Sequence, residues 1–165
     1  MNEIIGKSSK GHKVGSAGAV LAILCFFMPW MLASCGGQVE KLSGWQLAAG
    51  TTIGQGYYPQ KMDGRPILFL VLLAAIGVIV LAYLAYKRGT LQTIDGYGLI
   101  GLGALPLVIL LASFSGVKEQ SAQQGVLVEY QFGLWGVVLA NLAVIVGGVL
   151  NLGEEKDPNK ETPAE

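Results

Sequence analysis

Residues 66–88 read PILFLVLLAAIGVIVLAYLAYKR, an apolar run that contains no charge until it stops at Lys87 and Arg88. A helix needs about 20 mostly apolar residues to cross the hydrocarbon core of a bilayer. Pro66 is tolerated in the first turn of a helix, where a backbone N–H would have no partner within the helix. The stretch therefore predicts a membrane-spanning helix from about Pro66 to Tyr86.

Three further apolar stretches of similar length lie on both sides of this segment. They cover residues 14–33, 96–115 and 133–152. Pro106 lies inside the third span, where the loss of one backbone hydrogen bond predicts a kink. The fold class we expect is an all-α membrane protein, a four-helix transmembrane bundle that forms a single domain over residues 1–152. Residues 153–165 are polar and predict a disordered cytoplasmic tail.

The composition of the chain agrees with this expectation and argues against catalysis. Hydrophobic residues make up 52% and charged residues 13% of 165, whereas about a quarter of the residues of a soluble domain are charged. The net charge is zero, which provides no basic field for nucleic acid. The single His12 and the separated Cys25 and Cys35 do not form a usual metal or haem site. We expect that this chain is not an enzyme and that it binds no cofactor.

Positively charged residues predict the orientation, because Lys and Arg stay preferentially on the cytoplasmic side. Seven of them lie in the N-terminal segment, the turn after the second span and the C-terminal tail, and four lie in the two longer loops. Both termini are therefore expected in the cytoplasm and the loops 34–65 and 116–132 outside, in a multi-pass protein of the bacterial cytoplasmic (inner) membrane. We interpret His12 as part of the basic N-terminal segment. Aromatic residues are expected at the outer interface (Trp30, Tyr130, Trp135) and at the inner one (Tyr83, Tyr86, Tyr97).

Small residues recur on one face of two expected spans. They are Gly136, Ala140, Ala143 and Gly147 on the fourth span and Gly15, Ala19 and Ala22 on the first. Such residues let membrane helices approach closely, either within one bundle or between two copies of a chain. Asn141 is the strongly polar side chain deep in the fourth span. It is expected to bond between helices, with contact to a substrate or ion as the alternative.

The two outer loops are expected to form a small β-ribbon over the helix ends. Residues 126–132 are rich in β-branched and aromatic residues and predict a strand, and residues 38–42 are a weaker candidate. Residues 44–49 predict a short interfacial helix. The candidate partner surface comprises Trp45, Tyr57, Tyr58, Tyr130 and Trp135. The alternative is that these loops simply rest on the membrane surface.

Leu32-Ala33-Ser34-Cys35, followed by Gly36, resembles the lipobox of bacterial lipoproteins. The resemblance implies cleavage before Cys35 and acylation of its thiol, which would leave three spans. However, the upstream apolar stretch of about 18 residues is longer than the 7–15 residues of a signal peptide, and Pro29-Trp30 stands where small or aliphatic residues are usual. An intact first span is the favoured interpretation, and a lipid-anchored form with three spans is the alternative.

Three segments resemble uncharacterised small bacterial four-helix membrane proteins. They are residues 26–30 (FFMPW), 34–37 (SCGG) and 42–50 (LSGWQLAAG). The resemblance implies no activity. The expected function is association with lipid and with a membrane-protein partner or a second copy, as a subunit, scaffold or assembly factor. The alternative is a small oligomeric transporter or channel whose pore Asn141 would line.

Overall fold

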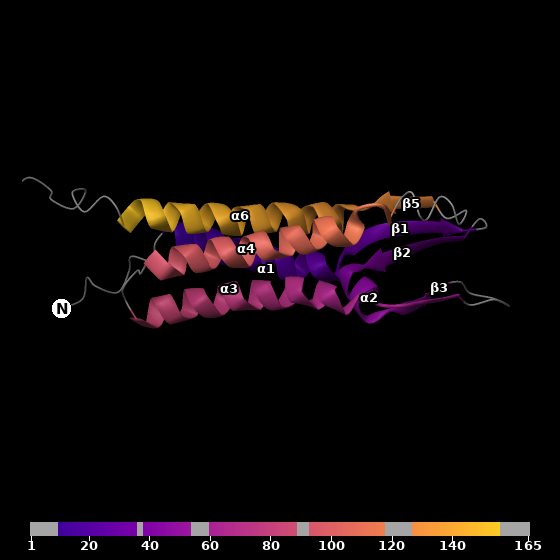
Figure 1. Ribbon diagram of the computed structural model, residues 1–165, viewed down its shortest axis with the longest axis horizontal. Helices are drawn as coiled ribbons and strands as arrows, with labels where there is room; N and C mark the ends of the chain where they lie inside the picture. Colours follow the sequence, from indigo (N-terminus) through magenta and orange to yellow (C-terminus); the bar gives the residue numbers. More distant parts are fainter. Residues whose placement is uncertain (1–9, 36–37, 54–59, 89–92, 118–126, 156–165) are drawn as a thin grey trace, which may run out of the picture.

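The computed structural model describes residues 10–35, 38–53, 60–88, 93–117 and 127–155, most of which are helical (Figure 1). Four long helices lie side by side along the long axis of the molecule (Figure 1). They are α1 (Lys10–Phe27), α3 (Phe69–Arg88), α4 (Thr93–Phe114) and α6 (Phe132–Glu155). Strands and a short helix extend from one end of them and form the cap (residues 29–35, 38–53, 60–65 and 127–130). The opposite end, where α1 and α4 begin, is called the basal end.

Three helices are long and apolar enough to cross a membrane. They cover Pro66–Arg88, Thr93–Phe114 and Phe132–Gly153, close to the spans expected from the sequence. The first of them opens with the 3-10 turn η1 (Pro66–Leu68), and α4 runs through Pro106 without interruption. Since α6 continues to Glu155, residues 153–155 are helical and not disordered as expected. The rest of the expected tail lies outside the described residues.

The first long helix, α1, starts and ends earlier than the sequence predicts. It ends at Phe27, because Pro29 has no backbone N–H and disfavours the helical conformation of the residue before it. Residues 29–33, which we expected within the first span, form a strand instead. The first turn of α1 contains Lys10 and Lys13, and this helix is not among the three spans identified in the described residues.

The cap contains a three-stranded antiparallel sheet in the order β2-β1-β5. The strands are β1 (Pro29–Cys35), β2 (Gln38–Ser43) and β5 (Leu127–Tyr130). The strands expected within residues 38–42 and 126–132 are confirmed, but they do not pair with each other as a ribbon. The unexpected strand β1 lies between them and pairs with both, so the cap sheet is centred on the segment that follows α1 directly.

A short helix and a second strand pair complete the cap. The helix α2 (Gly44–Ala49) confirms the one expected at these residues. It begins with a capping box, in which the Ser43 hydroxyl accepts from the Gln46 N–H at 3.3 Å and the Gln46 Oε1 accepts from the Ser43 N–H at 2.9 Å. The sequence analysis missed the antiparallel pair of β3 (Thr51–Ile53) and β4 (Gln60–Met62), which lies apart from the sheet in Figure 1.

The helix α6 packs closely against both α1 and α4. A Cβ added to Gly147 would lie 2.6 Å from the carbonyl oxygen of Gly11, and one added to Gly18 would lie 2.8 Å from a carbonyl oxygen of α6. On the other side, a Cβ added to Gly103 of α4 would lie 3.1 Å from the Asn141 carbonyl oxygen. These glycines let the helix backbones approach closely. The helix α3 packs against α1 and α4.

The buried apolar side chains form two clusters along the helices. The cluster near the cap includes Phe26, Trp30, Leu42, Leu68 and Val137. The cluster nearer the basal end includes Ala19, Val78, Leu99, Ala140 and Val144. Because the first cluster combines side chains of the strands with side chains of the helices, the cap and the helices share one core.

Candidate functional site

Trp30 joins the cap to the helices. Its side chain is fully buried, and its Nε1 donates to the Cys25 carbonyl oxygen at 2.8 Å, which satisfies one of the last carbonyls of α1. The Trp30 carbonyl oxygen accepts from the Gln131 N–H at 2.8 Å, beside the end of β5. A Cβ added to Gly44 would lie 2.6 Å from the indole, and one added to Gly133 would lie 2.9 Å from it. The expectation that Trp30 lies at the lipid interface is therefore wrong, because β1 places its ring in the core.

Two polar side chains of the cap bond the end of α4. The Arg65 guanidinium donates to the Ser113 carbonyl oxygen, and the Tyr130 hydroxyl donates to the Phe114 carbonyl oxygen at 3.2 Å. The last carbonyls of a helix have no partner within the helix, and a cation is favourable there. The cap is therefore fixed to α4 by side chains from two separate loops as well as to α1 by Trp30.

The short helix α2 places Trp45 on the apolar surface of the long helices. The indole stacks on Phe27 of α1 with ring centroids 5.9 Å apart, and meets Phe69 of α3 edge-on at 5.2 Å. Its exposed fraction is 45%. Indole rings concentrate at the boundary between lipid and water, since they combine an apolar body with one donor. This position agrees with a helix at the membrane interface.

The cap sheet has an inward and an outward face, because paired residues point to the same side and successive residues alternate. The inward face consists of Met31, Ala33, Glu40, Leu42, Val128 and Tyr130, and all of these except Glu40 belong to or pack against the core cluster near the cap. The outward face consists of Leu32, Ser34, Val39, Lys41, Leu127 and Glu129. Val39 and Leu127 are 58% and 70% exposed, so this face presents apolar side chains to its surroundings.

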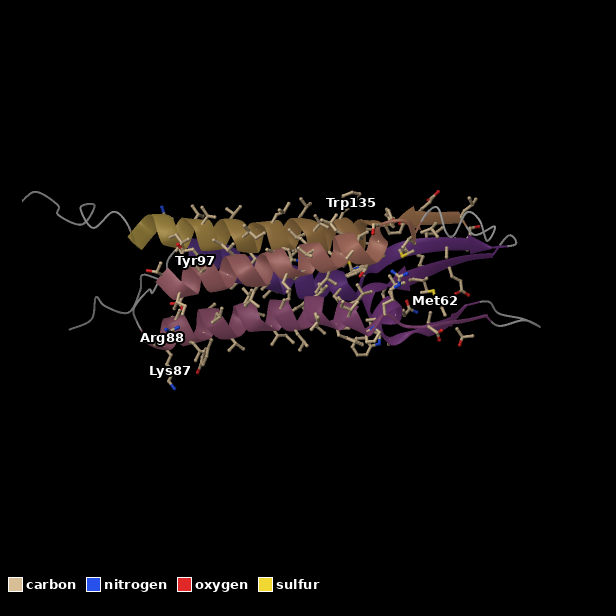
Figure 2. The ribbon with its side chains drawn as sticks, viewed as in Figure 1. Met62, Lys87, Arg88, Tyr97 and Trp135 are labelled. Carbon is tan, nitrogen blue, oxygen red and sulfur yellow. The ribbon has the colours of Figure 1, made fainter. Side chains whose placement is uncertain are left out.

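The residues of the predicted partner surface do not form a single patch. Trp45 lies on the α3 side of the molecule, whereas Trp135 lies on α6 at the opposite side and points away from the other helices (Figure 2). Tyr130 is half-buried on the inward face of the sheet. Tyr57 and Tyr58 lie outside the described residues.

The two small-residue stripes face each other within one chain. Ala19, Ala22 and Ala140 are at most 2% exposed. A Cβ added to Gly147 would lie 2.9 Å from the Gly15 Cα, and one added to Gly136 would lie 2.5 Å from the Cys25 sulfur. Ala143 is half-buried. In the described residues, these stripes pack α1 against α6. This agrees with the interpretation that they let helices approach closely within one bundle.

Asn141 is buried, but among the described residues its amide bonds within its own helix and not between helices as we expected. The side chain is 3% exposed, and its Nδ2 donates to the Val137 carbonyl oxygen of its own helix at 2.8 Å. This local bond uses one of the two N–H donors of the amide and involves no other helix. The part of Asn141 that meets α4 is its backbone carbonyl, which lies against Gly103.

A group of buried polar side chains at the basal end was missed by the sequence analysis. Asp95 is 2% exposed in the first turn of α4, and its carboxylate accepts from the guanidinium of Arg88 on α3 at 2.8 Å. His12 and Asn151 are 6% and 4% exposed on α1 and α6. His12, which the sequence placed in the basic N-terminal segment, is thus buried in the first turn of α1, between Lys10 and Lys13. The sequence contained a signal for the burial of two of these polar side chains. His12 lies three residues before Gly15 and Asn151 lies four residues after Gly147, so each lies on the same helix face as a small residue of the α1–α6 contact.

Cys25 and Cys35 occupy different positions in the fold. Cys25 is a free, buried thiol on α1 beside Gly136. Cys35, the predicted lipidation site, is the last residue of β1. Within the described ranges, no three His, Cys, Asp or Glu side chains are grouped so as to hold a metal ion.

Comparison with known proteins supplies no family for this arrangement. The chain matches no protein-family model, no curated protein and no solved structure. The function proposed below therefore depends on the geometry of the described residues.

Proposed function

We propose that this chain is a four-span integral membrane protein that acts by association, as a subunit, scaffold or assembly factor, and not as an enzyme. One observation carries the proposal: the cap is fixed to the helix ends, while its outward face leaves Val39 and Leu127 largely exposed at 58% and 70%. An ordered surface that presents apolar side chains away from the core is typical of protein–protein contact. The cap is the association surface in this proposal.

The packing and exposure of α1 support its assignment as the fourth span. Its four exposed apolar side chains near the cap are Val20, Leu21, Leu24 and Phe27. Comparable exposed apolar residues occur on each of the other three long helices, for example Leu73, Leu111 and Leu139. A lipid environment accounts for all of them, because the bilayer covers apolar side chains that water would not. The close contact of α1 with α6, which is one of the three candidate spans, supports a position of α1 within the bilayer.

The distribution of charge supports an orientation with the basal end in the cytoplasm. Lys87 and Arg88 end α3, and Lys10 and Lys13 lie in the first turn of α1, all at the basal end. Tyr83, Tyr86 and Tyr97 are 63–70% exposed near the same end, as expected for an aromatic belt. The cap would then lie outside the cytoplasmic membrane of a bacterium. Asn141, which the transport hypothesis requires at a pore, is buried in the single chain and gives that hypothesis no support.

Photo-crosslinking in intact membranes tests the proposal. A photoreactive amino acid would replace Val39 on the cap or, as the matched control, Leu73 on α3, because both side chains are 58% exposed. We expect discrete protein adducts from the Val39 position and mainly lipid adducts from the Leu73 position. If the Val39 position yields no more protein adducts than the Leu73 position, association through the cap is wrong.

A further inference from the structure

We propose that the partner of the cap is a second copy of this chain, and that the two copies pack through the outward faces of their β2-β1-β5 sheets. This proposal rests on the proposed function, since it names the partner for the same surface. It follows from the order of charged and apolar residues on the face. When a second copy is related to the first by a two-fold axis along the membrane normal, opposite charges face each other and apolar residues face each other.

The outward face consists of two parallel rows of paired residues. In the row nearer the helices, Leu32 of β1 lies between Lys41 of β2 and Glu129 of β5. In the next row, Ser34 lies between Val39 and Leu127. Each row therefore has a central residue on β1 and one partner on each outer strand. Lys41 and Glu129 lie two strand spacings apart, about 10 Å, so they do not neighbour each other within one sheet.

The symmetry of a membrane dimer decides which residues meet. Two copies that share one orientation in a bilayer are related by a two-fold axis parallel to the membrane normal, and such an interface uses the same patch on both copies. The strands run along the long axis of the molecule, as the helices do (Figure 1). A two-fold axis parallel to the strands therefore places β2 of one sheet opposite β5 of the other, with β1 opposite β1.

With this rotation, each row of one copy faces the same row of the other copy, and the facing residues are complementary. Lys41 of one copy faces Glu129 of the other, which forms two charge pairs of opposite sign. Val39 faces Leu127 in the same way, so the two most exposed apolar side chains of the face cover each other. Leu32 and Ser34 meet their own copies at the axis. A sheet with two cations or two anions at the outer positions of the row would repel itself in this arrangement.

The position of the face leaves room for a second copy. The inward face packs on the core cluster near the cap, so the outward face points away from that cluster. Next to β5 in the chain, α6 presents apolar side chains to its surroundings, with Trp135 and Leu139 58% and 64% exposed. The part of α6 that adjoins the cap is therefore apolar on its exposed side.

A crosslinking assay with charge variants tests this arrangement. Ser34→Cys, in a Cys35→Ser background, places a thiol near the axis, where facing sheets lie about 10 Å apart and a bifunctional maleimide of similar length can join two copies. Ala33→Cys is the matched control, because the neighbouring residue of β1 points to the inward face. We expect a crosslinked dimer of this chain from Ser34→Cys and little from Ala33→Cys.

The charge variants determine whether the rows meet as proposed. Lys41→Glu or Glu129→Lys alone places like charges together at two sites, and we expect about a tenfold loss of crosslinked dimer. The exchange of both residues in one chain should restore the dimer. Co-expression of the two single variants should also restore it, as a mixed dimer, because each then supplies the charge that the other lacks.

The outcomes separate this inference from the proposed function. Equal dimer yields from the original, single and exchanged variants overturn the proposed arrangement, as does the lack of a Ser34→Cys dimer. If the Val39 photo-crosslinker instead captures a protein of a different mass and no second copy, the self-association is wrong while association through the cap stands. If that position captures no protein, both proposals are wrong.

Discussion

Arg88 and Lys87 are adjacent cations at the end of α3 (Figure 2), but their environments differ. Arg88 donates to the carboxylate of Asp95, which is 2% exposed, whereas Lys87 is exposed and forms no ion pair among the described residues. Loss of a partner leaves a buried carboxylate with fewer hydrogen bonds, and that loss costs on the order of 1–3 kcal/mol.

Substitution of these two residues should therefore have unequal effects. We predict that Arg88→Met lowers the free energy of unfolding by about 1–3 kcal/mol, and that Lys87→Met changes it by less than about 0.5 kcal/mol. Both variants remove one positive charge from the same end of the same helix, so a change in orientation would affect both. Unfolding in detergent, followed by circular dichroism, measures the difference. Equal losses of stability would show that the ion pair with Asp95 contributes nothing.

Individual side chains were the least predictable part of this molecule. Trp30 and Trp135 are the same residue type near the same end of the helices, yet one is fully buried and the other is 58% exposed. Composition favours the lipid interface for both. The difference arises because Pro29 ends α1 and starts a strand that turns the Trp30 ring into the core. Such a change depends on the tertiary position of β1, which hydropathy does not encode.

At the scale of helices, the contact of α1 with α6 depends on the lack of side chains at specific glycines. A Cβ at position 147 would lie 2.6 Å from the Gly11 oxygen and 2.7 Å from the Gly15 nitrogen, and both are backbone atoms that cannot move alone. Gly101 of α4 provides a matched control, because a Cβ there meets nothing within 4 Å.

We predict that Gly147→Ala destabilises the protein by about 1–3 kcal/mol, since one added methyl group forces the two helices apart. Gly101→Ala should leave stability unchanged or raise it, because alanine favours the helix more than glycine does. Thermal unfolding of the two variants in the same detergent measures both effects. A Gly147→Ala variant as stable as the original would contradict the close packing of these helices.

Some elements were predictable because their signals are local. The helix α2 begins with Ser43 and Gln46 at the spacing of a capping box, and β5 carries a run of β-branched and aromatic residues. The spans at α3, α4 and α6 follow from uninterrupted apolar sequence. β1 was missed because Met31-Leu32-Ala33 is as apolar as the helix before it, and a short apolar run fits a helix or a buried strand equally well. The outward face of the cap could not be predicted without this strand.

At the scale of the whole molecule, the architecture depends on the first 34 residues, which cleavage before Cys35 would remove. Cleavage before Cys35 would remove α1 and nearly all of β1, the central strand of the cap sheet. β2 and β5 would then lose their common partner, and α6 would lose the helix that packs along its glycines. The proposed fold therefore requires the intact chain.

We predict that the protein purified from membranes retains its N-terminal segment and carries no lipid on Cys35. Mass spectrometry of the intact protein and of its peptides measures both properties. A peptide that contains Lys10 and Lys13 is the expected result. A mature protein that begins at an acylated Cys35 would contradict both the fourth span and the three-stranded sheet, and it would leave the lipobox as the correct interpretation.

The pairing of β1 with β5 also has a consequence for biogenesis. A ribosome makes β1 together with α1, but β5 emerges only after α3 and α4, so the sheet cannot close until three of the long helices have been synthesised. Until then, one edge of β1 carries backbone groups that β5 will later bond. β5 reaches this edge only if α4 ends on the same side of the membrane as α1. In the proposed membrane arrangement, completion of the sheet therefore distinguishes chains with correctly inserted helices from chains with a reversed helix.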